Sequence, residues 1–464
     1  MSTVSRTAIG RTILLAFIGT VLTITFLLSS RAKTTSSWRT QPYRFNVYPN
    51  SRPNTTSTDT QPIAEEESVN VECPELKGAE DVVVVVKTGA TEAAIRLPVL
   101  LKTSLRCVPP ENVLIFSDME QDIEDFDHHV YDALEGIPES ATNDNSDFDV
   151  YRKQQELREN GQDAQIPSLL SEFEDPRIPG TLAAWTLDKY KNLNMVKRSG
   201  TMVPDKKWYI FIDADTYLVW STTVAWLNAR DHKKETFFGS PSYIAGKEFA
   251  HGGSGMFLSG GGMQTFLAHN KTVEKFNKQV QNECCGDFVL ALALDDMGIK
   301  VTSAWPTIHG DYPSTIAFGY DRWCHPMATM HHVSVADMQQ IGLFEQERKN
   351  PSKPLLYSEL YRNLVSRLLS SSLEDWDNSS GWDYHEDDLS YDDCDEKCRT
   401  NGNCFQFSYN GKECYIQERF RLGTSKKAED DKRWRSVWRR KRIMEWIESN
   451  DRCDPIKFPE QKND

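Results

Sequence analysis

The segment of this chain that most strongly suggests a chemical function ends in two aspartates. These are Asp213 and Asp215, which are separated by one residue. The five residues before them, 208–212, are all aromatic or β-branched, which favours a buried strand. A buried strand that ends in Asp-x-Asp places its carboxylates at the carboxyl edge of a sheet, where open α/β folds bind ligands. Their oxygens suit a hard divalent cation and the diphosphate that it carries. A turn or a helix N-cap is the alternative role of the same pair.

Two glycine clusters follow and flank a short apolar segment. The first is His251-Gly252-Gly253-Ser254-Gly255, and the second is formed by residues 260–262. Glycines such as Gly253 and Gly255 let the backbone approach a bound ligand closely. Tight turns on either side of a strand at residues 256–258 are the alternative.

Alternating strand-like and helix-like segments surround these residues. Residues 82–86 and 112–118 have the pattern of buried strands, and a helical stretch at 92–105 separates them. This order predicts a parallel βαβ unit and an α/β fold. Helices are expected at 181–195 and 220–228, and a short strand at 236–239. The polar, acidic interval 119–179 predicts an insertion with some helix that lies over the site.

The amino-terminal region predicts a membrane anchor. Residues 12–30 carry no charge and would form a helix of about 29 Å, close to the roughly 30 Å of a hydrocarbon core. Arg6 and Arg11 favour the cytoplasm for the tail 1–11, which gives a type II orientation. A cleaved signal peptide is the alternative, and both place the rest in the secretory pathway. Residues 31–72 are rich in Ser, Thr and Pro and predict a stem.

Composition limits the class of partner. With 464 residues, 39% of them hydrophobic, the chain can form two or three domains, and its net charge of -15 argues against nucleic acid. All ten cysteines follow the predicted membrane segment, so disulfides are expected. Acceptor sequences for N-glycosylation begin at Asn54, Asn270 and Asn378 and agree with that placement.

A change in composition near Glu374 predicts a second, small α+β module at residues 374–425. Its closely spaced cysteines suit two disulfides, with zinc as the alternative: Cys394, Cys398, Cys404 and Cys414. In the remaining part, 426–464, residues 434–447 predict a basic, Trp-rich helix. We expect Trp434, Trp438 and Trp446 to pack it onto the larger domain, with Arg439, Arg440 and Arg442 in solvent.

Six short motifs, in this order, resemble the fringe-like β-1,3-glycosyltransferases, a family that includes the core 1 β-1,3-galactosyltransferases. They are Val84-Val85-Val86-Lys87-Thr88, Phe116-Ser117-Asp118, the segment 208–217, Gly252-Gly253-Ser254-Gly255, Gly286-Asp287-Phe288-Val289-Leu290-Ala291-Leu292 and Met330-His331-His332-Val333. The resemblance implies a GT-A nucleotide-diphospho-sugar transferase fold over residues 73–350 and a type II Golgi membrane protein. Residues 374–425 are similar to a shortened PAN or Apple module, which implies Cys394–Cys414 and Cys398–Cys404 pairs.

The resemblance also implies a role for each candidate residue. Asp215 would bind a Mn²⁺ that bridges the donor diphosphate, with Asp213 at the metal or the nucleotide. His331 would complete the metal shell, and His332 is the second choice. Asp287 matches the catalytic base. The uridine pocket would be lined by Lys87, Thr88 and Asp118, with Gly253 and Gly255 against the donor.

The implied activity is inverting transfer of galactose or a related hexose from a UDP-sugar to a hydroxyl of a glycan or glycoprotein, forming a β-1,3 linkage. One alternative is an inactive membrane-anchored protein that binds carbohydrate or protein. Another is a phosphohydrolase with an aspartyl nucleophile, although Tyr217 stands where that chemistry usually has Thr or Val. The donor sugar, the acceptor and the oligomeric state stay open.

Overall fold

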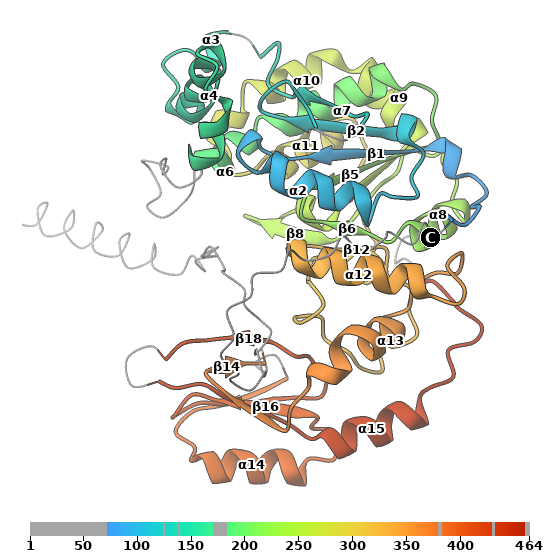
Figure 1. Ribbon diagram of the computed structural model, residues 1–464, viewed down its shortest axis with the longest axis vertical. Coiled ribbons are helices and arrows are strands. Elements are labelled where there is room, and N and C mark those ends of the chain that lie inside the picture. The colour runs from blue at the N-terminus through green and yellow to red at the C-terminus, as the bar shows by residue number, and fades with distance from the viewer. Residues whose placement is uncertain are drawn as a thin grey trace, which may run out of the picture. The chain divides into compact units, whose positions relative to one another are not determined.

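The computed structural model describes residues 72–123, 126–137, 139–169, 183–378, 383–428 and 432–459 (Figure 1). The predicted tail, membrane segment and nearly all of the predicted stem lie outside these ranges. Within them, no helix is both long and apolar enough to span a membrane.

The larger domain is built on an eight-stranded mixed sheet in the order β11-β7-β10-β5-β1-β2-β4-β3. Its strands are β1 (Val82–Lys87), β2 (Val113–Ser117), β3 (Gln121–Asp122), β4 (His129–Asp132), β5 (Trp208–Asp213), β7 (Phe237–Gly239), β10 (Met256–Ser259) and β11 (Val301–Ser303). Strand β1 is parallel to β2 and β5, whereas β10 is antiparallel to β5 and β7. The predicted α/β class and the βαβ unit are confirmed.

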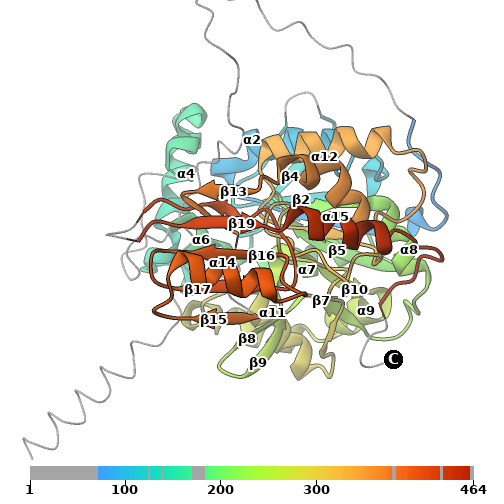
Figure 2. The same cartoon turned by 90° about the horizontal axis from the view of Figure 1, so that it is seen from below.

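Helices cover both faces of this sheet, which explains why every residue of β1 is buried. Val84 belongs to one core with residues of α2 (Ala90–Lys102), α8 (Trp220–Asn228) and α12 (Val335–Glu347). Val85 belongs to the other, with residues of α7 (Lys191–Met202), α9 (Gly260–Ala268) and α11 (Gly286–Asp296). Figure 1 shows α8 and α12 below β1 and β5, with α7 and α9 above them, and Figure 2 gives the view of the same elements from below.

Shorter elements complete the larger domain. They are α3 (Glu139–Thr142), α4 (Asp149–Glu159), α6 (Ala183–Asp188), β6 (Tyr217–Leu218), β8 (Pro241–Ile244), β9 (Lys247–Ala250), α10 (Asn270–Asn277), β12 (Thr329–Met330) and α13 (Tyr357–Leu360). Strand β6, directly after the two aspartates, pairs with β12 in antiparallel register. This pairing joins two parts of the chain that are far apart in sequence.

Two predictions for the larger domain need correction. The interval 119–179 is not wholly an insertion, because β4 extends the main sheet in parallel with β2. The helix expected at 181–195 is divided into α6 and α7. At the division, Lys189 Nζ lies 2.9 Å from a carboxylate oxygen of Asp147, and the Tyr190 hydroxyl donates to the same oxygen.

The carboxyl-terminal region forms a small five-stranded sheet in the order β13-β19-β16-β17-β15. Its elements are β13 (Ser372–Glu374), β14 (Trp376–Asp377), β15 (Tyr384–Glu386), α14 (Tyr391–Thr400), β16 (Gln406–Tyr409), β17 (Cys414–Gln417), β18 (Thr424–Ser425), β19 (Arg435–Trp438) and α15 (Arg440–Ser449). Disulfides join Cys394 to Cys414 and Cys398 to Cys404. The expected pairing is confirmed, and these four thiols are not a zinc site.

The helix predicted at 434–447 is wrong in its first half. Residues 435–438 form β19, which pairs with β13 and β16. Trp434 stacks on Tyr415 inside the module rather than on the larger domain. Trp446 packs edge-on against Trp323 of the larger domain, as expected.

Two of the three arginines expected in solvent are instead held by partners. Arg439 forms an ion pair with Asp395 at 2.9 Å. Arg442 donates to backbone carbonyls in the last turn of α14 and just after it, including that of Asn401 at 2.7 Å. These contacts connect the start of α15 to the module.

The module and the larger domain share a hydrophobic core. Phe405 and Phe420 of the module pack into the same core as Val84. The backbones of Phe318 and Phe420 exchange two hydrogen bonds of 2.7 and 2.9 Å, and a disulfide joins Cys324 to Cys453. Shared burial of this kind predicts that the two parts unfold together.

The remaining cysteines pair as Cys73–Cys107 and Cys284–Cys285, so all ten are in disulfides. Of the glycosylation acceptors, Asn270 is exposed. Asn378 is 0% exposed, and its side chain donates to the Phe407 carbonyl. The Asn378 amide is therefore inaccessible to solvent in the folded module.

Candidate metal and donor site

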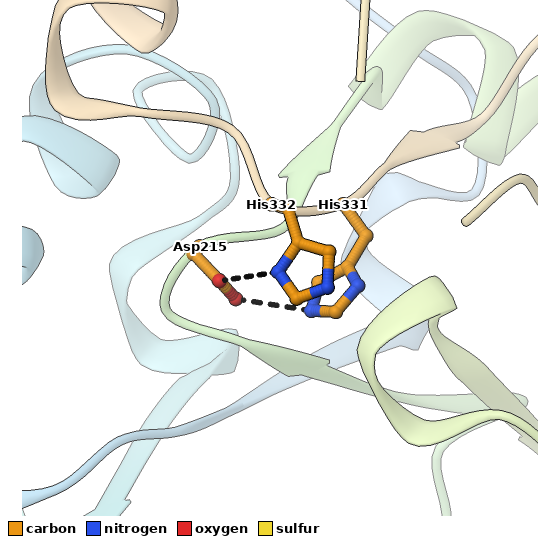
Figure 3. Close-up of side chains that lie close together, drawn as sticks. All are labelled: Asp215, His331 and His332. Atoms are coloured by element: carbon orange, nitrogen blue, oxygen red, sulfur yellow. Dashed lines mark ion pairs between the residues drawn. The ribbon is translucent and has the colours of Figure 1, made fainter. Parts of the chain in front are cut away.

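Asp215, His331 and His332 meet at the ends of β5 and β12 (Figure 3). His331 Nε2 lies 3.3 Å from Asp215 Oδ1, and His332 Nδ1 lies 3.4 Å from Asp215 Oδ2. One possible ligand atom from each residue falls within 4.8 Å of the others. The cause is the β6–β12 pairing, which sets Met330 opposite Tyr217 and leaves both histidines beside the acidic loop.

The backbone at His332 allows two consecutive side chains to face one carboxylate. His332 has a φ of 56°, in the left-handed region that non-glycine residues seldom adopt. In an extended chain neighbouring side chains would point to opposite sides. Here the two imidazole centroids are 3.8 Å apart. Such local strain is typical of functional sites.

Asp215 stabilises the charged form of His331, and both histidines stabilise the charged form of Asp215. Burial disfavours the charged form of His331, but the Asp215 carboxylate outweighs it and raises the pKa of that imidazole. Burial likewise opposes ionisation of Asp215, yet His331 and His332 hold its pKa well below the usual range. A cation could replace the protons that this arrangement attracts.

The donor set fits a divalent transition metal. One carboxylate and two imidazoles are ligands that Mn²⁺ accepts, whereas Mg²⁺ prefers oxygen alone. Nδ1 of His331 has no hydrogen-bond partner among the residues described. His332 therefore joins His331 at the candidate metal centre, where the resemblance had implied one histidine.

Asp213 does not belong to this cluster. Its Oδ1 lies 3.3 Å from Lys87 Nζ, because Asp213 and Lys87 stand opposite each other on β5 and β1. Burial raises the pKa of Asp213, and the Lys87 ammonium opposes that shift. Of the three predicted metal ligands, the structure brings Asp215 and His331 together and pairs Asp213 with a lysine.

Lys87 also forms an ion pair with Asp188, a residue that the sequence did not single out. Asp188 Oδ1 lies 3.0 Å from Lys191 Nζ, and Lys191 donates to the Thr88 carbonyl at 2.7 Å. Burial opposes ionisation of Lys87, but Asp188 and Asp213 raise its pKa. Lys87 and Thr88, which the resemblance implies for the uridine pocket, thus belong to a buried network in which acidic and basic side chains alternate.

Asp118 is the far end of this network. Its Oδ1 accepts the Ala90 backbone N–H at 2.6 Å, and its Oδ2 accepts from Gln154 at 3.0 Å. These bonds fix the start of α2 close to Thr88, whose hydroxyl oxygen is buried without a partner among the described residues. Thr88 directly follows Lys87, and Asp118 Oδ1 lies 3.6 Å from Lys191 Nζ, so both residues contact the network around Lys87.

We expect Asp188→Asn to destabilise the protein by about 3 kcal/mol or more, because it leaves Lys87 and Lys191 underpaired in a buried position. The midpoint of urea unfolding measures the change. Asp149→Asn, which removes an exposed pair with Arg152, is the matched control and should change stability by less than about 1 kcal/mol. Equal midpoints for the two variants would contradict the buried network.

Asp287, the predicted base, lies at the start of α11 and contacts the first glycine cluster. Its Oδ2 accepts the Gly252 backbone N–H at 2.7 Å, and its Oδ1 accepts that of Phe288 at 2.8 Å. Burial raises the pKa of this carboxyl, although the Gly252 N–H opposes the shift. Directly before α11 lies the disulfide between Cys284 and Cys285.

The Gly252–Ser254 turn lies between Asp287 and the metal cluster. A Cβ on Gly253 would stand 2.2 Å from the His331 ring, and the Gly253 carbonyl accepts the Thr216 hydroxyl at 2.7 Å. At Gly255 the φ of 99° itself favours glycine. The glycines thus allow close packing of the site's own residues, so a tight turn explains them without a ligand.

The sequence named His251 only as the first residue of a glycine cluster and predicted no role for it. Its Nδ1 lies 2.8 Å from the Ser254 hydroxyl, and its ring centre is 5.4 Å from that of His331. Burial, reinforced by the neighbouring histidines, lowers the pKa of His251 to about 3. It is therefore a neutral imidazole beside the metal cluster. Only its position next to the glycines could have drawn attention to it.

We expect Gly253→Ala to weaken binding of Mn²⁺ by at least about tenfold, because the added methyl group displaces the His331 ring. Calorimetric titration with MnCl₂ measures the affinity. Gly402→Ala is the matched control, since a Cβ there meets open space. If both variants bind Mn²⁺ as the parent does, His331 is not a ligand.

A scan against protein-family models found no match for this chain, and a search of curated proteins found none either.

Proposed function

We propose that this chain is a metal-dependent inverting glycosyltransferase of the GT-A type, similar to the fringe-like β-1,3-glycosyltransferases. It would transfer galactose or a related hexose from a UDP-sugar to a hydroxyl of a glycan or glycoprotein, forming a β-1,3 linkage. The observation that carries the proposal is the single Gly252–Ser254 turn that contacts Asp287 on one side and His331 of the metal cluster on the other.

In this proposal, different residues of the chain bind the metal and the donor and accept the proton. Asp215, His331 and His332 would hold Mn²⁺, which when bound neutralises charge on the donor diphosphate. Lys87, fixed by Asp188 and Asp213, supplies a positive charge close to that site. Asp213 itself fits the nucleotide role better than the metal role.

Asp287 would serve as the general base. Its carboxylate accepts the proton of the acceptor hydroxyl while that oxygen bonds to the anomeric carbon and the bond to the diphosphate oxygen breaks. One such displacement inverts the anomeric centre. The Gly252 N–H orients the carboxylate, because a hydrogen bond of 2.7 Å fixes its Oδ2.

Compartment and topology belong to the same proposal. Ten paired cysteines suit an oxidising lumen, which supports a Golgi protein with a type II anchor at residues 12–30. The phosphohydrolase alternative is weaker, because its nucleophile would be Asp213, a carboxylate already paired with Lys87.

The direct test is a donor screen on the purified full chain in detergent. UDP-galactose, UDP-N-acetylglucosamine and UDP-glucose are each offered with MnCl₂ or with EDTA, and released UDP is measured. The proposal expects Mn²⁺-dependent release from one donor, enhanced by an acceptor glycan. Absence of release from all three would favour the inactive binding protein.

The pH dependence of transfer should reflect the environment of Asp287. Because burial raises the pKa of this base, kcat/KM should fall, as the pH is lowered, at a pH above the value of about 3.9 for an exposed aspartate. Saturating Mn²⁺ prevents protonation of the histidines from limiting the rate. Full activity down to pH 4 would contradict the assignment of Asp287.

A further inference from the structure

Two adjoining cavities lie where α15 meets residues 320–325 of the larger domain. Their volumes are about 520 and 300 Å³. Tyr320, Trp446 and Ser449 line both, so we treat them as one depression and call it the α15 hollow. None of the residues lining it belongs to the Asp215 cluster or to the Asp287 turn.

Aromatic side chains form one wall of the α15 hollow. Tyr320 is 60% exposed, so much of its side chain is open to solvent. Trp446 is held in place by edge-to-face contacts with Trp323 and Phe405, at centroid distances of 5.3 and 5.8 Å. The wall thus offers flat, rigid apolar faces.

The charges around the hollow cancel. Arg322, Arg442 and Arg452 are balanced by Glu445, Glu448 and Asp451. A phosphorylated or sulfated ligand would need an excess of positive charge. The balance instead favours an uncharged ligand that both donates and accepts hydrogen bonds.

Several polar side chains in the hollow are available for such bonds. Within the described ranges, no side-chain hydrogen bond or ion pair is formed by Asn403, Glu448 or Arg452. In contrast, Arg442 is occupied by backbone carbonyls and Asp451 by Arg362. The free groups include an amide, a carboxylate and a guanidinium, which together pair well with neighbouring hydroxyls.

The two walls are covalently tied. The Cys324–Cys453 disulfide links residues 320–325 to the segment that follows α15. Arg322, a buried lining residue of the larger cavity, pairs with Asp321 and lies against the face of the Trp305 ring. The backbone of the two walls and the ring of Trp446 therefore need little ordering when a ligand binds, which lowers the free energy lost on binding.

We propose that the α15 hollow binds a neutral oligosaccharide, with a pyranose ring against Tyr320 and hydroxyls bound by Asn403, Glu448 and Arg452. The apolar face of a pyranose matches an exposed aromatic ring, and its hydroxyls match the unpaired polar groups. This site is separate from the Asp215 cluster and does not depend on the transfer reaction. It would hold a glycan while chemistry takes place elsewhere.

The test measures binding of mannotriose, galactotriose and N-acetylchitotriose to the full chain in detergent, without Mn²⁺ or UDP-sugar. Saturation-transfer NMR identifies the bound saccharide, and a titration gives its Kd. We expect saturable binding of at least one, with Kd on the order of 1 mM. Tyr320→Ala should weaken it about tenfold, and Glu448→Gln at least about threefold.

The controls separate this site from the rest of the protein. Tyr243 is 66% exposed on β8 and does not line the hollow, so Tyr243→Ala should bind as the parent does. Tyr320→Phe keeps the ring and should stay within about twofold. Asp215→Asn should also bind normally, which distinguishes this site from the proposed transfer site. Absence of binding by all three saccharides, or equal binding by Tyr320→Ala and Tyr243→Ala, would overturn the proposal.

Discussion

Replacement of Asp215 with asparagine should abolish measurable Mn²⁺-dependent binding of UDP. The amide cannot supply the negative charge that His331 and His332 now face at 3.3 and 3.4 Å. Loss of residues that merely support a ligand costs about 10- to 100-fold in metal affinity, so loss of the carboxylate should cost at least about 100-fold. Calorimetric titration with MnCl₂, then with UDP at fixed Mn²⁺, measures both steps.

The control for this variant is Asp296→Asn in α11, where an exposed carboxylate pairs with Lys275. It should bind Mn²⁺ and UDP as the parent does. Unchanged heats for Asp215→Asn itself would exclude the Asp215 cluster as the metal centre.

Asp287→Asn should preserve donor binding and stop transfer. The amide oxygen can still accept the Gly252 N–H, while the Phe288 N–H in the first turn of α11 loses its side-chain acceptor, so the turn beside His331 keeps its shape. The variant has no base for the acceptor proton, which should reduce kcat by about 10²- to 10⁴-fold. Binding of Mn²⁺ and UDP should stay within about twofold.

Asp295→Asn, an exposed position on the same helix, controls for effects on α11. It should turn over normally. If Asp287→Asn also turned over at the parent rate, another group would have to remove the proton. A loss of UDP binding in Asp287→Asn would instead mean that this residue positions the donor.

Local sequence patterns predicted the central elements because the residues of each short segment indicate its burial and the direction of the chain. Helix α8 occupies the predicted residues 220–228, and β1, β2, β5 and β10 coincide with the apolar segments. Each of these elements is covered by others, so its own composition decides its conformation. The placement of Asp213 and Asp215 at the end of β5 followed for the same reason.

Which residues meet at the candidate site depends on contacts between distant segments, and no local sequence pattern indicates such contacts. Strands β6 and β12 have two residues each, too short for any periodic signal, yet their pairing brings His331 and His332 to Asp215. The Lys87–Asp188 pair links β1 to the end of α6 in the same way. Only the resemblance drew attention to the two histidines.

Segment 434–447 failed for a different reason: a local pattern was present here, but it predicted the wrong element. The tryptophan and arginine spacing is compatible with a helix, but Trp438 is needed in the core and its indole N–H donates to the Arg421 carbonyl at 2.8 Å. Val437 enters the separate core around the module's disulfides. Two neighbouring residues that enter different cores require an extended chain, and tertiary packing therefore overrides the helical pattern.

Pulsed electron paramagnetic resonance of bound Mn²⁺ tests the central claim most directly. One Mn²⁺ per chain should bind, with ¹⁴N couplings from the two imidazoles of His331 and His332, and UDP should tighten that binding. The couplings should disappear when both histidines are replaced with alanine. A bound Mn²⁺ without nitrogen coupling, or an affinity that UDP does not change, would contradict a metal centre that carries a nucleotide sugar.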